Sequence, residues 1–310
     1  MGEASAVNPE PKPVVFIHTN DRQIVGALVA RHALQRNSRT PDAFEVRIIE
    51  TRDFPFLAAR EGQPFHRDGI TRVWRNDDLQ SFTPLRFIPP ELMGYQGRAL
   101  IIDPDIFAVA DVCELLFRDM QGKAVVCRMR NGPKGKFGYY ASSVMLLDCA
   151  KLRHWRCREQ FEELFSFQRD YMDWVSLKLE DPNTIGRCED EWNDFDKLTP
   201  QTKMLHNTRR LTQPWKTGLP IDFEPPDAFK PIPMYAWLMR FGRRFFGPNK
   251  LIGHYWRHPD ANQERLFFGL LRECIDKGIV TEQMLREEMS RNHVRHDAFQ
   301  VLERTTPLAA

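Results

Sequence analysis

Short, wholly apolar runs alternate along the chain with amphipathic stretches, which is the pattern of an α/β protein. Residues 14–19 (Val-Val-Phe-Ile-His-Thr) are apolar and rich in β-branched residues, and predict a buried parallel strand. Apolar positions three and four residues apart then predict a helix from Ile24 to about Gln35, with Asn20 and Asp21 available to cap it. This opening is a βαβ unit. Four further strands are predicted at residues 44–49, 99–102, 125–127 and 143–147.

The distribution of proline predicts where the main domain ends. Six prolines lie within residues 214–233, and this density precludes a regular helix or strand. After it, two helical patterns occupy residues 262–277 and 281–302. The predicted organisation is a disordered tail (1–13), a main α/β domain (14–218), a proline-rich linker (219–233) and a C-terminal helical region (234–310).

Composition narrows the classes of function. Hydrophobic residues make up 42% of the chain and charged residues 28%, which excludes collagen-like and low-complexity disordered proteins. No uncharged apolar run reaches the roughly 18 residues that a transmembrane helix needs. A formal net charge of +2 argues against a nucleic-acid-binding protein that depends on its global charge. The six cysteines form no Cys-x-x-Cys pair, as expected for reduced thiols in a cytoplasmic protein.

Two carboxylates directly follow the wholly apolar strand at residues 99–102. Asp103 and Asp105 occupy alternate positions, so their side chains are expected to point to the same side. Open α/β sheets bind ligands at the carboxyl ends of their strands, and two hard oxygen ligands there suit Mg²⁺ or Mn²⁺ bridging phosphates. The alternative is a strand-end turn with helix capping. A second Asp-x-Asp, residues 194–196, follows no apolar strand and is interpreted as structural.

Three other segments carry candidate polar chemistry. His206 falls in a polar, basic loop, where it could complete a metal–diphosphate site or belong to a solvated surface. Ser142 and Ser143 enter a predicted strand, where small residues permit close approach of a ligand or tight packing. Asp170 lies at the start of a predicted helix, where a capping carboxylate is the simpler interpretation. The cations of the His206 loop are Lys203, Arg209, Arg210 and Lys216.

Taken in order, these motifs resemble those of glycosyltransferase family 8, the retaining group with a GT-A fold that includes glycogenin and bacterial lipopolysaccharide galactosyltransferases. The resemblance covers about residues 14–218 and rests on the order and spacing of several short motifs. They are the first strand, Arg86-Phe87-Ile88-Pro89, the strand ending in Asp103-Pro104-Asp105, Ser142-Ser143-Val144-Met145, Gln168-Arg169-Asp170, Trp192-Asn193, and His206 with Gln213-Pro214-Trp215.

The resemblance implies a Rossmann-like GT-A domain that binds a nucleotide-sugar, usually UDP-linked, together with Mn²⁺ or Mg²⁺. It implies that Asp103, Asp105 and His206 are the metal ligands. Asp170 matches the last carboxylate of the family's Asp-Gln-Asp segment, so it would be the catalytic residue beside the reacting sugar. The implied nucleotide-sugar contacts are Thr19, Asn20, Arg86, Asp103, Ser142 and Ser143.

Three motifs depart from the family pattern. The family's His-x-x-Gly-x-x-Lys-Pro-Trp has Arg209 in place of the glycine, Gln213 in place of the lysine, and one additional residue. The diphosphate contact of that lysine would pass to one of the nearby cations, of which Arg209, Arg210 and Lys216 are the candidates. The other two altered motifs read Gln168-Arg169-Asp170 and Ala141-Ser142-Ser143.

The leading hypothesis is a metal-dependent retaining glycosyltransferase that acts on a glycan or glycolipid acceptor, without a nucleic-acid partner. One alternative is a nucleotide-sugar- or glycan-binding protein of the same fold without transferase activity. Another is a nucleotidyltransferase, although the Gly-rich basic loop usual in that class is absent after the first strand, where residues 18–22 read His-Thr-Asn-Asp-Arg.

Residues 230–258 are basic and aromatic. They contain six Lys or Arg residues and no Asp or Glu, with aromatic residues interspersed. This composition suits the headgroup layer of an anionic bilayer, so one prediction is peripheral contact with the inner face of a membrane. The alternative prediction is that the aromatic rings pack on the main domain while the cations face water.

Overall fold

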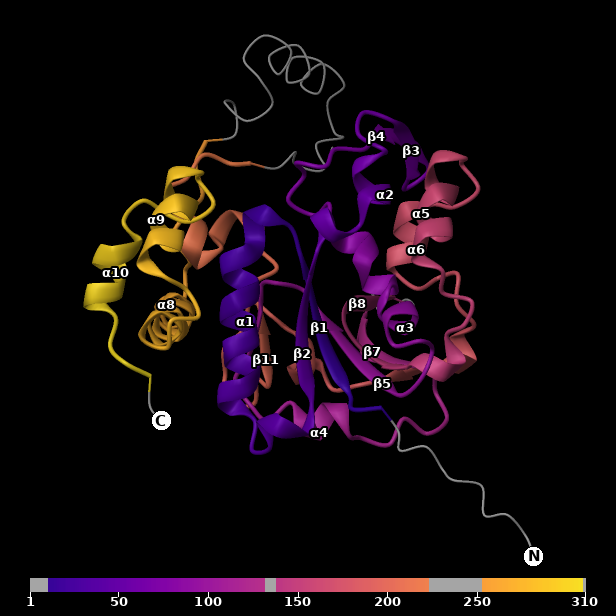
Figure 1. The fold of residues 1–310 in the computed structure, drawn as a ribbon, viewed down its shortest axis with the longest axis horizontal. Coiled ribbons are helices and arrows are strands. Elements are labelled where there is room, and N and C mark those ends of the chain that lie inside the picture. Colours follow the sequence, from indigo (N-terminus) through magenta and orange to yellow (C-terminus); the bar gives the residue numbers. More distant parts are fainter. Residues whose placement is uncertain (1–10, 132–137, 223–252, 309–310) are drawn as a thin grey trace, which may run out of the picture.

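The computed structural model of the chain describes residues 11–131, 138–222 and 253–308 (Figure 1). Most of the expected tail, the expected linker from residue 223 onward, and residues 230–252 of the basic, aromatic segment lie outside the described residues. The described part of the chain is an α/β fold around a six-stranded sheet, with helices on both faces (Figure 1). The predicted fold class is therefore confirmed at this level.

The large sheet is mixed, and the first half of its strand order is parallel. β1 (Val14–Thr19) pairs in parallel with β2 (Glu45–Glu50) and β5 (Arg98–Ile102). β8 (Tyr139–Asp148) is antiparallel to both β5 and β7 (Val125–Arg130), while β9 (Ile185–Arg187) is parallel to β7. All five strands predicted from apolar runs are present. The complete order is β2-β1-β5-β8-β7-β9.

Successive residues of the central strands enter two different cores, which explains why these strands are apolar without alternation. Val15 and Ile17 of β1 pack toward α1 (Ile24–Asn37) and α8 (Ala261–Asp276). Val14 and Phe16 pack into the core on the opposite face. That face is covered by α3 (Pro89–Leu92), α5 (Cys157–Phe165) and α6 (Tyr171–Val175), as Figure 1 shows.

A small three-stranded sheet positions the His206 segment. β6 (Ile106–Ala108) begins directly after Asp105, and β11 (Met204–His206) runs antiparallel to it with His206 opposite Ile106. β10 (Asp194–Phe195) completes this sheet. The expectation that His206 lies in a polar loop is wrong, because it ends a buried strand. The remaining short elements are α2 (Pro55–Ala58), α4 (Cys113–Leu116) and the hairpin of β3 (Pro64–Arg67) with β4 (Ile70–Val73).

The C-terminal helices pack against α1 and share its core. Phe267 of α8 stacks on Trp215, with ring centroids 4.7 Å apart. A polar link joins the same two helices, because Glu273 of α8 contacts His32 Nε2 at 2.7 Å and Arg36 Nε at 2.9 Å. No helix in the described ranges is both long and apolar enough to cross a membrane.

The helix predicted at residues 281–302 is wrong as one continuous element. It is divided into α9 (Glu282–Ser290) and α10 (Ala298–Arg304). Asn292 adopts a left-handed backbone conformation, with φ of 61°, which cannot continue a right-handed helix. The apolar residues keep a helical spacing on both sides of the break because both helices bury residues in the same core, including Leu285 and Val301.

Candidate functional site

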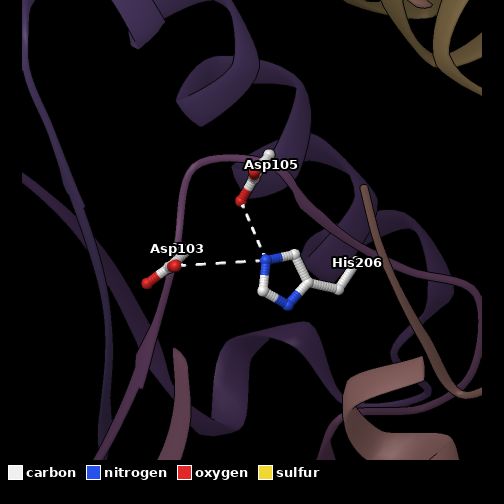
Figure 2. A group of neighbouring side chains, drawn as sticks. All are labelled: Asp103, Asp105 and His206. Atoms are coloured by element: carbon white, nitrogen blue, oxygen red, sulfur yellow. Dashed lines mark ion pairs between the residues drawn. The ribbon is translucent and has the colours of Figure 1, made fainter. Parts of the chain in front are cut away.

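Three predicted metal ligands converge where β5 ends. Oxygen or nitrogen atoms from Asp103, Asp105 and His206 all lie within 4.8 Å of one another. Figure 2 shows the imidazole of His206 turned toward both carboxylates. Its Nε2 atom is 3.4 Å from Asp105 Oδ1 and 4.0 Å from Asp103 Oδ2. Antiparallel pairing of β11 with β6 produces this convergence, because it places His206 beside the residue that follows Asp105.

The turn that carries the two carboxylates rests against the first helix. A Cβ atom at Gly26 of α1 would lie 2.7 Å from the carbonyl oxygen of Pro104, the residue between Asp103 and Asp105. Real Cβ atoms do not approach a backbone oxygen so closely. A glycine at this position therefore allows the helix and the turn to pack together, and any larger residue must displace one of them.

Asp105 is held through one oxygen and has the other without a partner. Gln213 Nε2 donates a hydrogen bond to Asp105 Oδ2 at 3.0 Å. Asp105 Oδ1 is buried, faces His206 Nε2 and has no hydrogen-bond partner among the described residues. A buried carboxylate oxygen without a partner is costly, and a bound cation would remove that cost. Two carboxylates and one imidazole therefore form a donor set that fits Mn²⁺ or Mg²⁺.

The tautomer of His206 is set by Asn193. Asn193 Oδ1 lies 2.8 Å from His206 Nδ1, and Asn193 Nδ2 donates to Ser143 Oγ at 2.9 Å. Since the Asn193 oxygen only accepts, Nδ1 carries the proton and Nε2 presents its lone pair to the carboxylates. Asn193 belongs to the Trp192-Asn193 motif but was not among the predicted site residues, and its place in that motif was the signal that could have identified it.

Asp103 is ionised and shared among three basic groups. Arg86 donates from Nε to Asp103 Oδ1 at 2.9 Å and also pairs with Oδ2, while His18 Nε2 lies 3.0 Å from Oδ1. Burial alone would raise the pKa of Asp103, but Arg86, His18 and His206 outweigh it and hold this pKa well below its usual range. Burial lowers the pKa of His18, despite the attraction of Asp103, so its imidazole tends to stay neutral.

The three converging residues line a cavity of about 350 Å³. Three further predicted residues, Arg86, Ser142 and Ser143, line the same cavity. Arg86 Nη1 donates to Ser142 Oγ at 3.0 Å, which connects the arginine to the strand that supports the cavity. The cavity also has lining residues that sequence analysis did not select, because they come from distant segments without a local motif. Among them are Arg67 and Arg130.

Four of the predicted nucleotide-sugar contacts lie outside the lining of this cavity. Thr19, Asn20, Arg209 and Lys216 are not among the described residues that line the cavity. Asn20 Nδ2 donates to Ser81 Oγ at 3.0 Å and to the Asp78 carbonyl at 3.2 Å, so it holds the segment that presents Leu79 and Gln80 to the cavity. Arg209 is exposed, whereas its neighbour Arg210 lines the cavity.

Lys216 is committed to a buried cluster. Its side chain is fully buried, and Nζ lies 2.7 Å from Asp222 Oδ2. Tyr255 donates its hydroxyl to the other oxygen of Asp222. Burial raises the pKa of Asp222, but Lys216 and Tyr255 outweigh it and the net shift is downward. Tyr255 belongs to the basic, aromatic segment, and its burial agrees with packing at this one position.

Asp170 caps a short helix. Its Oδ1 atom accepts hydrogen bonds from the backbone N–H of Met172 at 2.7 Å and of Asp173 at 3.3 Å, at the start of α6. Its Oδ2 atom accepts from the backbone N–H of Gly69 at 3.0 Å, which ties the β3–β4 turn to that helix. Asp170 itself is not among the described residues lining the cavity, although Tyr171 and Met172 are.

No family model and no curated protein sequence matches the chain. Among solved structures, it is similar to the galactosyltransferase LgtC in complex with donor and acceptor sugar analogues, with 13% identity, 65% of this chain and 89% of that chain covered, and a TM-score of 0.45. It is also similar to the glycosyltransferase GlyE of Streptococcus pneumoniae, with 15% identity, 66% of this chain and 56% of that chain covered, and a TM-score of 0.47. It is similar as well to mouse xyloside xylosyltransferase 1, with 13% identity, 63% of this chain and 97% of that chain covered, and a TM-score of 0.42.

Proposed function

We propose that the chain is a divalent-metal-dependent, retaining glycosyltransferase of the family 8 type, which moves a sugar from a UDP-linked donor to a glycan or glycolipid acceptor. The observation that carries the proposal is the unpartnered Oδ1 atom of Asp105, which faces His206 Nε2 beside the ionised Asp103. This cluster lies at the carboxyl end of β5 and lines a cavity, as a ligand site of an α/β sheet should.

In this proposal, Asp103, Asp105 and His206 hold Mn²⁺ or Mg²⁺. The bound ion would supply positive charge to the diphosphate leaving group. Gln213 and Asn193 orient two of the ligands, and Arg86 keeps Asp103 ionised. Arg210, which lines the cavity, takes the diphosphate contact of the family's lysine in preference to Lys216, whose ammonium group is paired with Asp222.

Ligand-induced stabilisation tests the donor and the metal together. The protein is heated with UDP-, GDP-, CDP- or ADP-sugars, each with and without Mn²⁺. A ligand at 100 times its Kd should raise the free energy of unfolding by about 2.7 kcal/mol, and we expect this only for UDP-sugars with Mn²⁺. D105N should lose the additional stabilisation that Mn²⁺ provides. D77N, which alters a largely exposed carboxylate, should retain that stabilisation. Metal-dependent stabilisation of D105N would contradict the proposal.

A nucleotide-sugar-binding protein without transferase activity is the second candidate. The position of Asp170 favours it, since three backbone N–H groups occupy its carboxylate and the side chain does not line the cavity. Turnover distinguishes the two candidates. A transferase releases UDP from UDP-sugar in the presence of Mn²⁺, with acceptor or slowly with water, whereas the binding protein binds the same donor and releases none.

The cytoplasmic location and the membrane contact stay predictions. Of residues 230–258, the structure describes only residues 253–258. Within them, Trp256 is 63% exposed while Tyr255 is buried. We retain peripheral contact with an anionic membrane as part of the proposal for a glycolipid acceptor, and co-sedimentation with anionic vesicles at low and high salt tests it.

A further inference from the structure

The cavity carries more positive charge than a diphosphate and its metal require. Among the described lining residues, four arginines face two aspartates, and Asp103 is already paired with Arg86. A divalent ion would bring two positive charges, which match the two negative charges of a nucleotide diphosphate. Asp78 opposes the charge of Arg210 from outside the lining, so a positive excess of one charge remains on the cavity wall. The four arginines are Arg67, Arg86, Arg130 and Arg210.

Two of these arginines have aromatic rings as neighbours where a carboxylate would be expected. Arg67, at the end of β3, has its guanidinium carbon 4.6 Å from the centroid of the Tyr171 ring. Arg130, at the end of β7, lies 4.4 Å from the centroid of the Phe195 ring. Within the described ranges neither forms an ion pair. Arg130 Nη1 also donates to the Tyr139 hydroxyl, and its remaining N–H groups, like those of Arg67, stay available for a planar oxyanion.

Arg67 also lies close enough to Arg210 to affect it. Burial lowers the pKa of Arg210, and the positive charge of Arg67 lowers it further, while Asp78 acts in the opposite direction. Two like charges near one another in a partly buried cavity repel more strongly than in water. An anion bound in the same cavity would relieve this repulsion.

We propose that the cavity recognises a second anionic group in addition to the donor diphosphate, and that Arg67 and Arg130 bind it. The group is a carboxylate or a phosphate carried by the transferred sugar or by the acceptor. This inference rests on the proposed function and specifies its substrate class: an acidic donor sugar or a phosphorylated acceptor. Arg67 and Arg130 are then determinants of specificity, separate from the residues that hold the metal.

Paired ligands that differ in one anionic group test the inference by isothermal titration calorimetry. With Mn²⁺ present, UDP-glucuronate is compared with UDP-glucose, and UDP-galacturonate with UDP-galactose. For the acceptor, glucose 1-phosphate is compared with glucose, each titrated into protein saturated with UDP and Mn²⁺. The charged member of at least one pair should bind about tenfold more tightly, as a charge-assisted hydrogen bond to arginine implies. The donor pairs and the acceptor pair separate the two sources of the anion.

Three variants assign that preference to residues. R67Q and R130Q should each reduce the preference for the charged ligand while UDP itself still binds with Mn²⁺. R153Q is the matched control, because Arg153 also lies over a ring, 5.9 Å from the Tyr95 centroid, but does not line this cavity. It should leave every affinity unchanged. Melting temperatures and UDP binding show that each variant is folded.

The outcomes distinguish failure of this inference from failure of the proposed function. Equal affinities within every pair, with UDP and Mn²⁺ still binding, overturn the inference and leave the proposed function in place. A charged-ligand preference that survives in both R67Q and R130Q overturns the assignment to these residues. Absence of any Mn²⁺-dependent UDP binding overturns the proposed function, and the inference with it.

Discussion

Gln213 donates a hydrogen bond from its side-chain amide to the Oδ2 atom of Asp105 across 3.0 Å. Gln213, at the position of the lysine in the motif that this segment resembles, therefore contacts a carboxylate of the cluster of Asp103, Asp105 and His206. Gln213 is almost fully buried, so its amide has little access to bulk water. Its hydrogen bond fixes the orientation of Asp105 and directs the other oxygen, Oδ1, toward His206.

Replacing Gln213 should weaken metal binding without removing a ligand. We expect Q213L to lower the affinity for Mn²⁺ about tenfold, because groups that orient metal ligands typically contribute ten- to a hundredfold. Calorimetric titration of Mn²⁺ in the presence of UDP measures the change. The control is Q160L, which alters another buried glutamine, on α5, where the amide donates to the His154 carbonyl. Equal Mn²⁺ affinities in Q213L and wild-type protein would contradict the orienting role.

Gly26 should tolerate no side chain. We expect G26A to lower the free energy of unfolding by about 1–3 kcal/mol, because the new Cβ must displace the Pro104 carbonyl. The same displacement should weaken Mn²⁺-dependent UDP binding, since Pro104 lies between Asp103 and Asp105. G269A is the matched control in α8, where the three described atoms nearest to the added Cβ all belong to the side chain of Leu308. It should leave UDP binding intact, and urea unfolding together with UDP titration follows both effects.

Substitutions at Asp170 separate capping from catalysis. Asparagine also caps helices well, but its amide nitrogen cannot accept the N–H of Gly69, so D170N should keep the cap and lose that one link. D170A should lose the link and, in addition, about 1 kcal/mol from the cap. If Asp170 acts on the sugar, D170N lowers kcat and leaves the KM for the donor almost unchanged. Steady-state kinetics with a UDP-sugar and Mn²⁺ provide the readout. A wild-type kcat in D170N would assign Asp170 to capping of α6 alone.

Acidification should loosen the contact between α1 and α8 through His32. Burial lowers the pKa of His32, although Glu273 acts in the opposite direction. The unfolded chain therefore takes up a proton at a higher pH than the folded chain, so the free energy of unfolding falls as the pH drops below about 6.5. The pKa of Glu273 is lowered, because His32 and Arg36 outweigh the effect of burial. The contribution of Glu273 to the free energy of unfolding is therefore lost only at lower pH.

Urea unfolding at about pH 7.5 and about pH 5.5 measures this dependence. H32Q should show a smaller difference between the two conditions than the wild type. Some pH dependence should persist, because burial also lowers the pKa of His18. An identical difference in H32Q and wild-type protein would exclude His32 as a contributor.

Much of the fold could be predicted because the central strands of its large sheet are buried on both faces. A strand such as β1 has no polar side, so residues 14–19 stand out from their surroundings without any knowledge of their partners. The small sheet of β10, β11 and β6 could not be predicted in this way. Its strands have two or three residues, and only pairing between distant segments makes them strands. The expectation of a loop at His206 was wrong for this reason.

The candidate site also combines residues that could be selected from the sequence with residues that could not. Asp103 and Asp105 could be selected because they follow a recognisable strand, and His206 was added by the motif order of a family. No motif pointed to Arg67 or Arg130. Each is the last residue of a strand, and the sequence of that strand does not show what the arginine faces. Lys216 was expected near a phosphate, but its partner, Asp222, lies only six residues further along the chain. Composition alone cannot distinguish a cation available to a ligand from one already paired.

The cluster of Lys216, Asp222 and Tyr255 has a consequence for how the protein can vary. Ile221 donates its backbone N–H to the Gly253 carbonyl at 3.2 Å, and Pro220 forms a bridge with His254. The chain therefore leaves the described fold and returns to it at adjacent positions, which the hydrogen bond from the Tyr255 hydroxyl to Asp222 also joins. When two ends of a chain are held this close together, changing the length of the connection between them has a small entropic cost. We therefore expect the described fold to accept changes of length between residues 222 and 253, since each end is held by contacts of its own.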